Sequence, residues 1–456
     1  MNPSPDLSDL RAHVAGTVLN PDDAGFAEEV SGFNLAASFH PLVAVGVTSE
    51  ADVVEAVRFA ARHDLPIRVL ATGHGPAAPV TDGMLIVTRR LDSLHVDPET
   101  HIATVGAGLK WEAVQAAAAP FGLTAITGSS PDVGAIGLTL GGGIGPLARS
   151  HGYTSDYARS FRIVTRDGEA MTASATENPD LFWALRGGKG GLGVVTGMSI
   201  ELVDLPLIYG GAVIFDTPHI ETVLRGWIDW TTSAPDDVTT SIAIIRFPPA
   251  EFVPEPLRGR HAIALRFAYP GSAEDGERLV APLRSLAPAI MDMIGELPTS
   301  KMGLIHNDPT DPLPAWDIGA LLTGVDQELA TVVLGQLGAG VQTPLMITEL
   351  RHLGGRTAVD VPEGSAAGGR SGRFSLYSIG VPDPALFATV LPAAGGALSD
   401  ALAPWVAPQT MVNFAGAFSS RAHFESAWPP EIFSRLETVR KAYDPAGLFT
   451  YGPAAG

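Results

Sequence analysis

Cysteine is absent from the 456 residues of this chain. That absence excludes disulfides, zinc–thiolate sites, iron–sulfur clusters and thiol catalysis. No uninterrupted apolar run reaches about 18 residues, so no membrane-spanning helix is expected. The first residues, MNPSPDL, form neither a basic leader nor an apolar segment. We therefore expect no secretory signal and a cytoplasmic location.

Basic residues are few, since 29 Lys and Arg stand against 49 Asp and Glu, which gives a formal net charge of −20. No Lys/Arg cluster stands out, so neither nucleic acid nor an anionic membrane is an expected partner. The net negative charge is explained by the solubility it provides, and it does not indicate the class of substrate. Neither an H-E-x-x-H motif nor a carboxylate cluster is present, which predicts no metal site. We expect a small-molecule substrate and a monomer or homodimer.

The length predicts two lobes rather than one core. A helix over 49–63, strands over 67–70, 84–88 and 102–105, and a helix over 111–119 predict an α+β cofactor lobe. Residues 1–205 and 406–456 are assigned to this lobe, with a C-terminal helix ending at 443–445. Residues 206–405 are assigned to a separate substrate domain of antiparallel sheet and helices, in which 361–372 is expected to be a mobile loop.

Glycine is concentrated around one histidine. His74 lies in Gly73-His74-Gly75 after an apolar strand, and residues 141–145 contain four glycines in five positions. Because glycine has no Cβ, its backbone N–H can approach a pyrophosphate. A plain flexible turn would also explain each glycine loop. Residues 188–193 match G-x-G-x-x-G, but they follow a predicted helix and precede a strand, which argues against a Rossmann NAD site. A P-loop is excluded because Gly188-Lys189 is followed by glycine.

The motifs together resemble those of a known family. They are Arg68…Gly73-His74, the segment 128–145 with its Leu-Gly-Gly-Gly-x-Gly run, Glu177-Asn178-Pro179-Asp180-Leu181-Phe182-Trp183-Ala184-Leu185-Arg186-Gly187-Gly188, and Tyr443-Asp444-Pro445-x-x-Leu448-Phe449. The sequence resembles the FAD-linked oxidases of the vanillyl-alcohol-oxidase (PCMH-type) superfamily, in the bacterial berberine-bridge-enzyme-like branch near the 6-hydroxynicotine oxidases. The resemblance is dense over 34–202 and 410–456 and thin between them. It implies a two-lobed α+β fold with a PCMH-type FAD-binding domain.

The resemblance also implies how the cofactor is held. The family attaches the flavin 8α-methyl to a histidine at the position of His74, although a lone histidine can be a merely structural polar residue. Many relatives add a thioether from a cysteine where this chain has Ser130, and serine cannot form it, so mono-covalent FAD is expected. Val133 falls where the family controls access of oxygen to the flavin. A small residue there implies O2 as electron acceptor, with simple packing as the alternative.

The catalytic base is left open by the sequence. Many relatives supply a tyrosine from a Tyr-x-Asn stretch, but here the stretch reads Met411-Val412-Asn413, and methionine cannot accept a proton. Glu349, on the predicted strand 345–353, would have a raised pKa if buried in that apolar strand and could then act as the base. The alternative is an ion pair with Arg351, which lies on the same strand face, or a solvated edge. His151 is a second candidate base and Tyr153 lies beside it, whereas His306 is interpreted as a structural loop residue.

The expected function is oxidation of a small organic alcohol, amine or phenolic secondary metabolite by FAD, followed by reduction of O2 to H2O2. The alternatives are a carbohydrate oxidase of the same family and a low-turnover flavin-containing protein that binds a metabolite. The predicted catalytic residues are Glu349, His151, Tyr153 and Arg351. The predicted cofactor-binding residues are His74, Arg68, Ala71, Thr72, Gly73, Gly75, Gly128, Ser129, Ser130, Val133, Gly134, Gly137, Leu140, Gly141, Gly142, Gly143, Gly145, Gly190, Gly193, Val195, Asn413 and Tyr451.

Overall fold

The computed structural model describes residues 5–75, 79–416 and 420–452. The chain begins with a small lobe built on a four-stranded sheet of order β1-β2-β4-β3. Strands β2, β4 and β3 are parallel, and β1 pairs antiparallel with β2. The elements are α1 (Ser8–His13), β1 (Thr17–Leu19), α2 (Phe26–Glu29), β2 (Val43–Gly46), α3 (Glu50–Arg62), β3 (Ile67–Leu70) and β4 (Met84–Val87).

A second sheet stands beside the first, with the order β5-β6-β10-β8-β9 and antiparallel pairing throughout. Its strands are β5 (Leu94–Asp97), β6 (Ile102–Gly106), β8 (Ala158–Val164), β9 (Ala170–Ser174) and β10 (Val194–Glu201). The helices around it are α4 (Trp111–Ala118), α5 (Ala135–Thr139), α6 (Ala148–His151) and α7 (Pro179–Leu185). A short ladder joins β7 (Leu123–Thr124) to β11 (Val203–Asp204).

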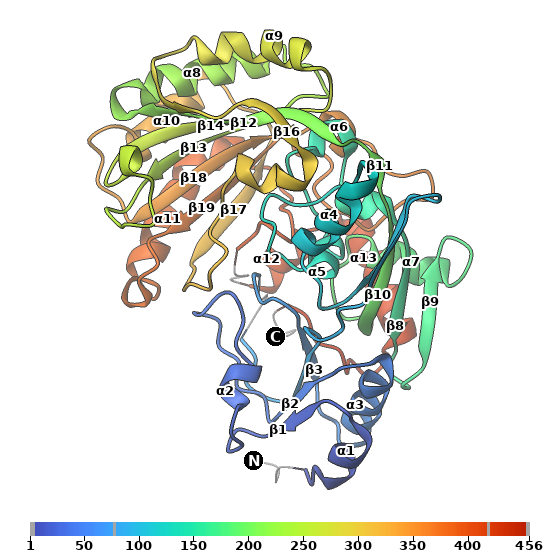
Figure 1. Cartoon of the computed structure of the whole chain (residues 1–456). Helices are drawn as coiled ribbons and strands as arrows, with labels where there is room; N and C mark the ends of the chain where they lie inside the picture. The colour runs from blue at the N-terminus through green and yellow to red at the C-terminus, as the bar shows by residue number, and fades with distance from the viewer. Residues whose placement is uncertain (1–4, 76–78, 417–419, 453–456) are drawn as a thin grey trace.

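The second lobe is a large antiparallel sheet of order β15-β12-β14-β13-β18-β19-β17, with β16 paired to β12. Its strands are β12 (Leu207–Asp216), β13 (Thr239–Arg246), β14 (His261–Tyr269), β15 (Ala289–Asp292), β16 (Gly295–Pro298), β17 (Asp317–Leu322), β18 (Leu345–His352) and β19 (Phe374–Gly380). Helices α8 (Ile220–Thr231), α9 (Ala273–Arg284), α10 (Gln327–Leu337) and α11 (Val390–Leu402) cover one face (Figure 1). The other face is turned toward the first lobe.

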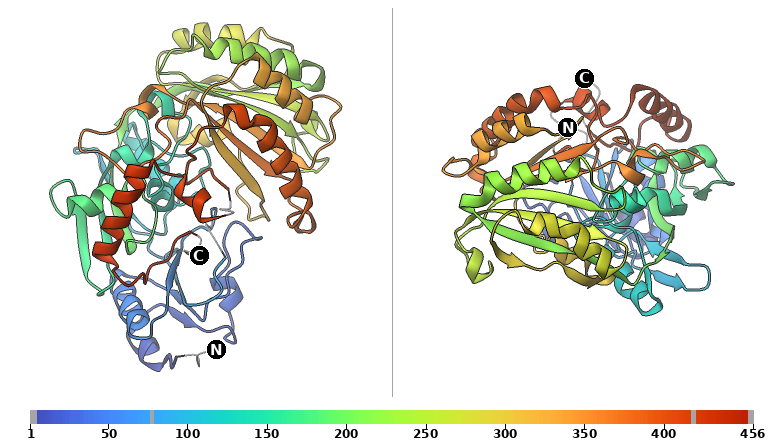
Figure 2. Two further views of the ribbon diagram at one scale, coloured as in Figure 1. Left: turned by 180° about the vertical axis from the view of Figure 1, so that it is seen from behind. Right: turned by 90° about the horizontal axis from the view of Figure 1, so that it is seen from above.

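The chain then returns to the first lobe through α12 (Arg421–Glu425) and α13 (Pro430–Tyr443). Figure 2 shows α13 alongside the second sheet, although it follows the large sheet in sequence. Phe424, Trp428 and Leu436 are buried in the same core as the strands of the second sheet, whereas the core of the second lobe draws on residues between Tyr209 and Leu402. The division at 205/206 and 405/406 stays a prediction, and Ala366, which it assigns to the second lobe, is buried in the core of the first.

The α+β fold expected from the sequence is confirmed. Helix α3 begins after Ser49, whose side chain accepts from the Asp52 N–H, as its capping spacing predicts. Strands β10 and β18 match their predicted ranges to within one residue. The C-terminal helix ends as predicted but begins at Pro430, earlier than its sequence pattern indicates. Within the described ranges, no helix combines the length and apolarity that a membrane crossing requires.

Candidate active site

His74 follows strand β3 and is fixed on two sides. Its Nε2 lies 2.9 Å from Asp132 Oδ2, and its ring stacks on Phe33 with centroids 3.7 Å apart and an interplanar angle of 15°. Ser130 donates to the other carboxylate oxygen, Oδ1, at 2.7 Å. Burial opposes the ionisation of Asp132, but the bonds from His74 and Ser130 outweigh it and lower the pKa of the carboxyl. The carboxylate therefore holds the Nε2 proton, and Nδ1 is the ring nitrogen left with a lone pair.

Bare backbone surrounds this histidine. A Cβ at Gly73, whose φ is +75°, would stand 2.7 Å from the Cα of Gly32, so no other residue fits there. A Cβ at Gly75 or Gly137 would meet no atom within 4 Å, so both stretches of main chain border open space. The Gly134 N–H donates to Thr72 Oγ1 at 3.3 Å, which joins the His74 turn to the segment 128–145. Exposed N–H groups beside open space are what a pyrophosphate needs.

The remaining predicted cofactor residues fall into three groups. Ala71 and Ser129 border the turn and its partner loop, and Val133 is half-buried against the core of the first lobe. Tyr451 packs where a side chain at Gly190 would stand, and burial lowers the pKa of the nearby Arg68. The structure places the others in the segment 128–145 outside α5, or at and just before the start of β10, where they remain predictions: Gly128, Leu140, Gly141, Gly142, Gly143, Gly145, Gly193 and Val195.

Lys189 is a residue that the sequence interpretation passed over. Its Nζ donates to Gly137 O and to Asn413 Oδ1, both at 2.6 Å, while Asn413 Nδ2 donates to Leu138 O at 2.9 Å. Burial lowers the pKa of Lys189 to about 8. The two side chains tie the glycine loop at 188–193 and the C-terminal segment to α5. A basic residue within a run of glycines was the available signal.

The sheet face opposite the turn carries a buried group of charges. Glu349 Oε1 accepts from Ser241 Oγ and from Arg266 Nη1, both at 2.6 Å, and Oε2 accepts from Arg351 Nε at 2.7 Å. His306 Nε2 lies 3.3 Å from the same Oε1. His306 was interpreted as a structural loop residue, but it reaches this cluster because the segment 299–305 packs near Pro131.

The raised pKa expected for a buried Glu349 is wrong. Burial does oppose its ionisation, yet Arg351 and Arg266 together hold the pKa well below its ordinary value. The ion pair with Arg351, which the sequence left as the alternative, is the observed state. A carboxylate this acidic is a poor proton acceptor near neutrality. Glu349 is better suited to orienting the two arginines than to acting as the base.

A second acid on the same sheet face, Asp317, has the raised pKa that Glu349 lacks. Asp317 on β17 and Tyr377 on β19 are joined by a side-chain hydrogen bond, and burial raises the pKa of Asp317 to about 6. Tyr377 pairs directly with Glu349 across the ladder, so the two side chains lie on one face. The Phe414 ring is edge-on to Tyr377 at 5.6 Å and lies under the Arg351 guanidinium at 5.0 Å. Both groups therefore face the C-terminal segment.

His151 and Tyr153 lie away from this cluster. His151 lines a hollow with Asp156, Tyr157, Arg159 and residues of the 356–363 segment, none of which belongs to the Glu349 group. Tyr153 is 1% exposed, donates to Gly368 O at 3.2 Å and packs in an apolar cluster with Met411. Burial raises its pKa, so it is a poor base. The structure does not bring these two predicted residues together with Glu349 and Arg351.

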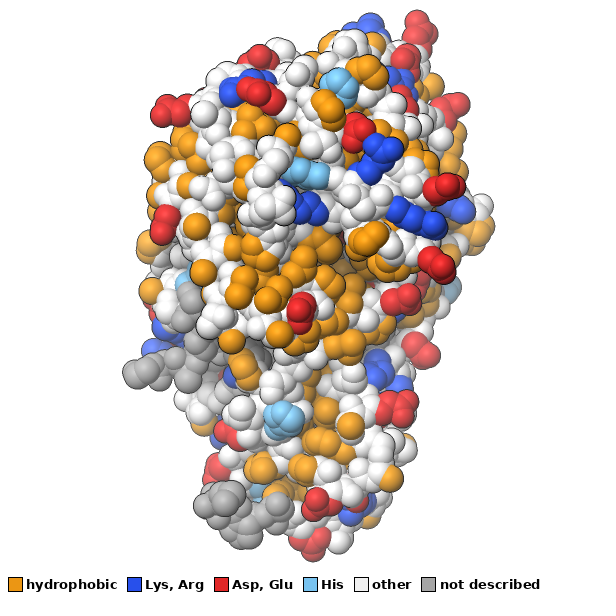
Figure 3. All heavy atoms as spheres, turned by 90° about the vertical axis from the view of Figure 1, so that its left-hand side faces the viewer, with side chains coloured by type: hydrophobic (Ala, Val, Ile, Leu, Met, Phe, Trp, Pro, Cys, Tyr) orange, Lys and Arg blue, Asp and Glu red, His pale blue; other side chains and the backbone are white. Residues whose placement is uncertain are grey.

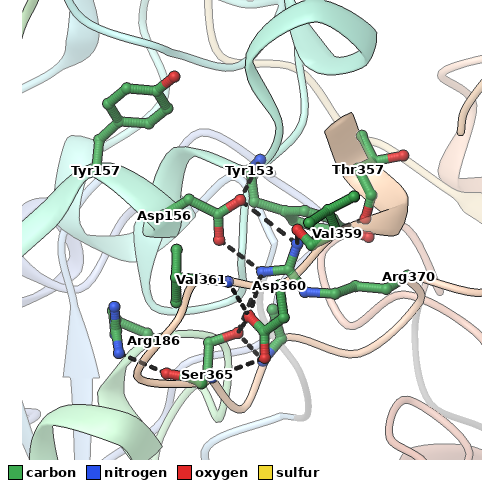
Figure 4. Close-up of polar contacts among 12 residues, drawn as sticks. Tyr153, Asp156, Tyr157, Arg186, Thr357, Val359, Asp360, Val361, Ser365 and Arg370 are labelled. Carbon is green, nitrogen blue, oxygen red and sulfur yellow. Dashed lines mark hydrogen bonds and ion pairs between the residues drawn. The ribbon is translucent and has the colours of Figure 1, made fainter. Parts of the chain in front are cut away.

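The segment expected to be a mobile loop is tied down instead. Figure 4 shows Asp156 and Asp360 both directed at Arg370, whose Nη2 lies 2.5 Å and 3.0 Å from their carboxylates. Ser365 donates to Asp360 at 2.7 Å and is 2% exposed. The buried Arg186 adds an ion pair to Glu363. This network fixes the segment beside Tyr153, over whose ring the Arg370 guanidinium lies.

Comparison with known proteins decides the family. Residues 41–174 match the family described as an FAD binding domain. The (R)-6-hydroxynicotine oxidase of Paenarthrobacter nicotinovorans is 26% identical, with 96% of each chain aligned. The folds of the Physcomitrella patens BBE-like 1 protein (TM-score 0.82, 19% identity) and the Microdochium nivale carbohydrate oxidase (TM-score 0.83, 18% identity) each cover 98% of both chains. Residues 41–174 are thus an FAD-binding domain, and the whole chain has the fold of the berberine-bridge-enzyme-like proteins.

The residues of this FAD-linked oxidoreductase fit its cofactor. Open space lies beside Gly75 and Gly137, and a hydrogen bond links the His74 turn to the 128–145 loop. Nδ1 of His74 is the ring nitrogen that does not face Asp132. FAD is thus the cofactor, as the sequence predicts, and the protein is an enzyme. The position of the usual tyrosine is held by Met411, which is 3% exposed and packed in an apolar cluster, so the base must lie elsewhere.

Proposed function

We propose that this enzyme is an oxidase that carries FAD covalently on His74 and oxidises a small organic alcohol, amine or phenolic metabolite, with O2 reduced to H2O2. The observation that carries the proposal is the contact of His74 Nε2 with Asp132, because it leaves Nδ1 free as the atom for attachment. A lone histidine held only as a structural residue would not need a buried carboxylate and a stacked ring.

The proton leaves the substrate toward Asp317. At neutral pH a carboxyl with a pKa of about 6 is ionised and can accept a proton from the substrate O–H or N–H, either directly or through the Tyr377 hydroxyl. In the relay, Tyr377 passes its own proton to Asp317 as it takes the substrate proton. FAD, when bound, supplies the two-electron acceptor for the hydride that leaves the adjoining carbon.

One face of the molecule favours an apolar metabolite over a sugar. Figure 3 shows hydrophobic side chains gathered across the middle of that face. A carbohydrate lying there would leave hydroxyl groups without partners. The carbohydrate oxidase alternative therefore ranks second, supported by the fold of the Microdochium nivale carbohydrate oxidase.

Electron transfer to O2 is supported by the similarity to a nicotine oxidase and a carbohydrate oxidase, and by the small Val133 near the cofactor loop. The test is steady-state H2O2 release with alcohols, amines and phenols, alongside anaerobic bleaching of the flavin by the same compounds. Bleaching without peroxide would overturn the oxidase proposal in favour of another acceptor. A flavin that no compound bleaches would favour the low-turnover binding protein. The cytoplasmic location and the monomeric or homodimeric state remain predictions.

A further inference from the structure

The charge group around Glu349 holds one more cation than anion. Arg266, Glu349 and Arg351 are 6%, 4% and 9% exposed, so all three are withdrawn from water. Burial and the two arginines lower the pKa of His306, which is therefore neutral and adds no charge. Two guanidinium groups thus share one carboxylate in a protein whose overall charge is −20. A buried cation without a counter-ion destabilises a fold, so its retention calls for an explanation.

The excess charge is directed at the cofactor side. Arg351 uses Nε on Glu349, while Nη1 and Nη2 each lie 3.4 Å from Ser129 Oγ, at the long limit of a hydrogen bond. The guanidinium side chain is 10% exposed, and its plane lies over Phe414. His306 Nδ1, buried beside it, has no hydrogen-bond partner among the described residues. The fork of Arg351 thus offers donors that no strong acceptor of the protein takes up.

The other acids of this region are already engaged. Asp317 is hydrogen-bonded to Tyr377, and Asp308 contributes to the raised pKa of that tyrosine. Asp132 is held by His74 and Ser130. Among the described residues, Glu349 is the carboxylate that forms an ion pair with Arg351.

The rest of the sheet face has the opposite character. Along the β13–β18 ladder, Ser241 pairs with Arg351, Ala243 with Glu349 and Ile245 with Ile347. The face is therefore polar and cationic at one end and apolar at the other, with small side chains between them. The polar end offers a site for an anionic oxygen pair, whereas Ala243 and Ile245 are 0% and 7% exposed and are packed in one cluster with Val253 and Leu257.

We propose that the substrate carries a carboxylate that is bound by the Arg351 fork. Glu349 positions the fork by holding Nε, so that both terminal nitrogens face the ligand in the planar geometry that suits a carboxylate. This deepens the proposed function, on whose substrate site it rests. It commits to the class of substrate: a carboxylic acid that bears the oxidisable alcohol, amine or phenol.

The test is calorimetric titration of the FAD-loaded enzyme with benzoate and with benzamide, which share size and ring but differ in charge. Benzoate is expected to bind at least tenfold more tightly. Arg351→Met should remove this preference, leaving the two dissociation constants within about twofold of each other. Arg278→Met, which removes an exposed arginine remote from this group, should leave the preference unchanged. Equal binding of both probes to the wild-type enzyme, or a preference that survives Arg351→Met, would overturn the proposal.

A second variant covers the case in which Arg351→Met does not fold. Ser129→Asp keeps all three charged residues and places a carboxylate beside the fork of Arg351. It should abolish benzoate binding while benzamide still binds. Benzoate binding undiminished in this variant would overturn the proposal. Because the titration needs no turnover, a failure to release H2O2 would overturn the proposed function and leave the carboxylate preference measurable.

Discussion

His74 Nε2 and Asp132 Oδ2 are 2.9 Å apart, and this contact determines which atom of the histidine is available for chemistry. Asp132 is in turn held by Ser130, at the position where many relatives carry a second flavin-linking residue. In this chain Ser130 therefore orients the carboxylate of Asp132, and that carboxylate orients His74. The proposed attachment of the flavin therefore depends on the same three side chains that orient His74.

Replacing Asp132 by Asn should lower the fraction of polypeptide that carries bound flavin. The amide cannot stabilise positive charge on the imidazole while Nδ1 forms a bond, and it also offers its own N–H groups to Nε2. The bound fraction, measured by flavin absorbance of protein purified after denaturation, is expected to fall at least severalfold. Ser130→Ala, which removes one hydrogen bond and no charge, should reduce it less. Full attachment in Asp132→Asn would show that the carboxylate has no part in it.

The pH dependence of flavin reduction should follow Asp317. Because burial raises the pKa of this carboxyl to about 6, the ionised form that accepts a proton is populated only above that pH. The rate of anaerobic reduction is expected to rise through about pH 6 and then level off. Asp317→Asn should abolish that rise and slow reduction at least 100-fold, whereas Tyr377→Phe should slow it less. A wild-type profile flat between pH 5 and 8 is incompatible with Asp317 as the base.

Folding stability should decrease as Asp317 ionises, whereas the rate of flavin reduction should increase. The pKa of Asp317 is higher in the folded protein than in the unfolded chain, so folding is favoured most when the carboxyl is protonated. This contribution is fully present below about pH 4 and is lost as the pH rises through about 6. Relative to the wild type, Asp317→Asn should therefore be stabilised more at pH 8 than at pH 4. The difference between these two effects on the unfolding free energy should be at most roughly 3 kcal/mol. Urea titrations at the two pH values measure this difference, and an equal effect at both would contradict a raised pKa.

Glu349→Gln should act on stability rather than on the proton. Removing the carboxylate leaves Arg266 and Arg351 buried without a counter-ion, which destabilises by about 3–5 kcal/mol in comparable buried pairs. If the variant can be isolated, its flavin reduction should retain the rise near pH 6. A variant that folds normally but loses this rise would make Glu349 the base after all.

Asn413→Ala should weaken the connection between α5 and the C-terminal segment. It removes the acceptor of Lys189 Nζ and the donor to Leu138 O, which together should reduce the unfolding free energy by about 1–3 kcal/mol. Asn413→Asp keeps the acceptor for Lys189 and should lose less. The urea midpoint for flavin exposure compares the two, and equal midpoints for Asn413→Ala and the wild type would contradict this role.

The sequence predicted the fold and FAD as the cofactor because local patterns carry both. The capping spacing of Ser49, the strand before His74 and the glycine loop are each decided by residues close together in the chain. The catalytic side is assembled by the register of a sheet whose strands are remote in sequence, such as β17 and β19. No local sequence pattern predicts that Asp317 is hydrogen-bonded to Tyr377, or that Arg266 and Arg351 both form ion pairs with Glu349.

His306 and Lys189 show the same limit. A histidine before Asn307 and a lysine among glycines carry no periodicity, so only the fold reveals that one reaches the buried ion group and the other bonds Asn413. His151 and Tyr153 stay predicted catalytic residues, and the structure places them apart from the Glu349 group.

The most direct test of the account is the fate of the flavin when the purified protein is precipitated with acid. The account predicts that the yellow chromophore stays with the wild-type polypeptide, on a peptide that contains His74, and is released from His74→Ala. A colourless precipitate with free FAD in the supernatant of the wild-type protein would contradict it.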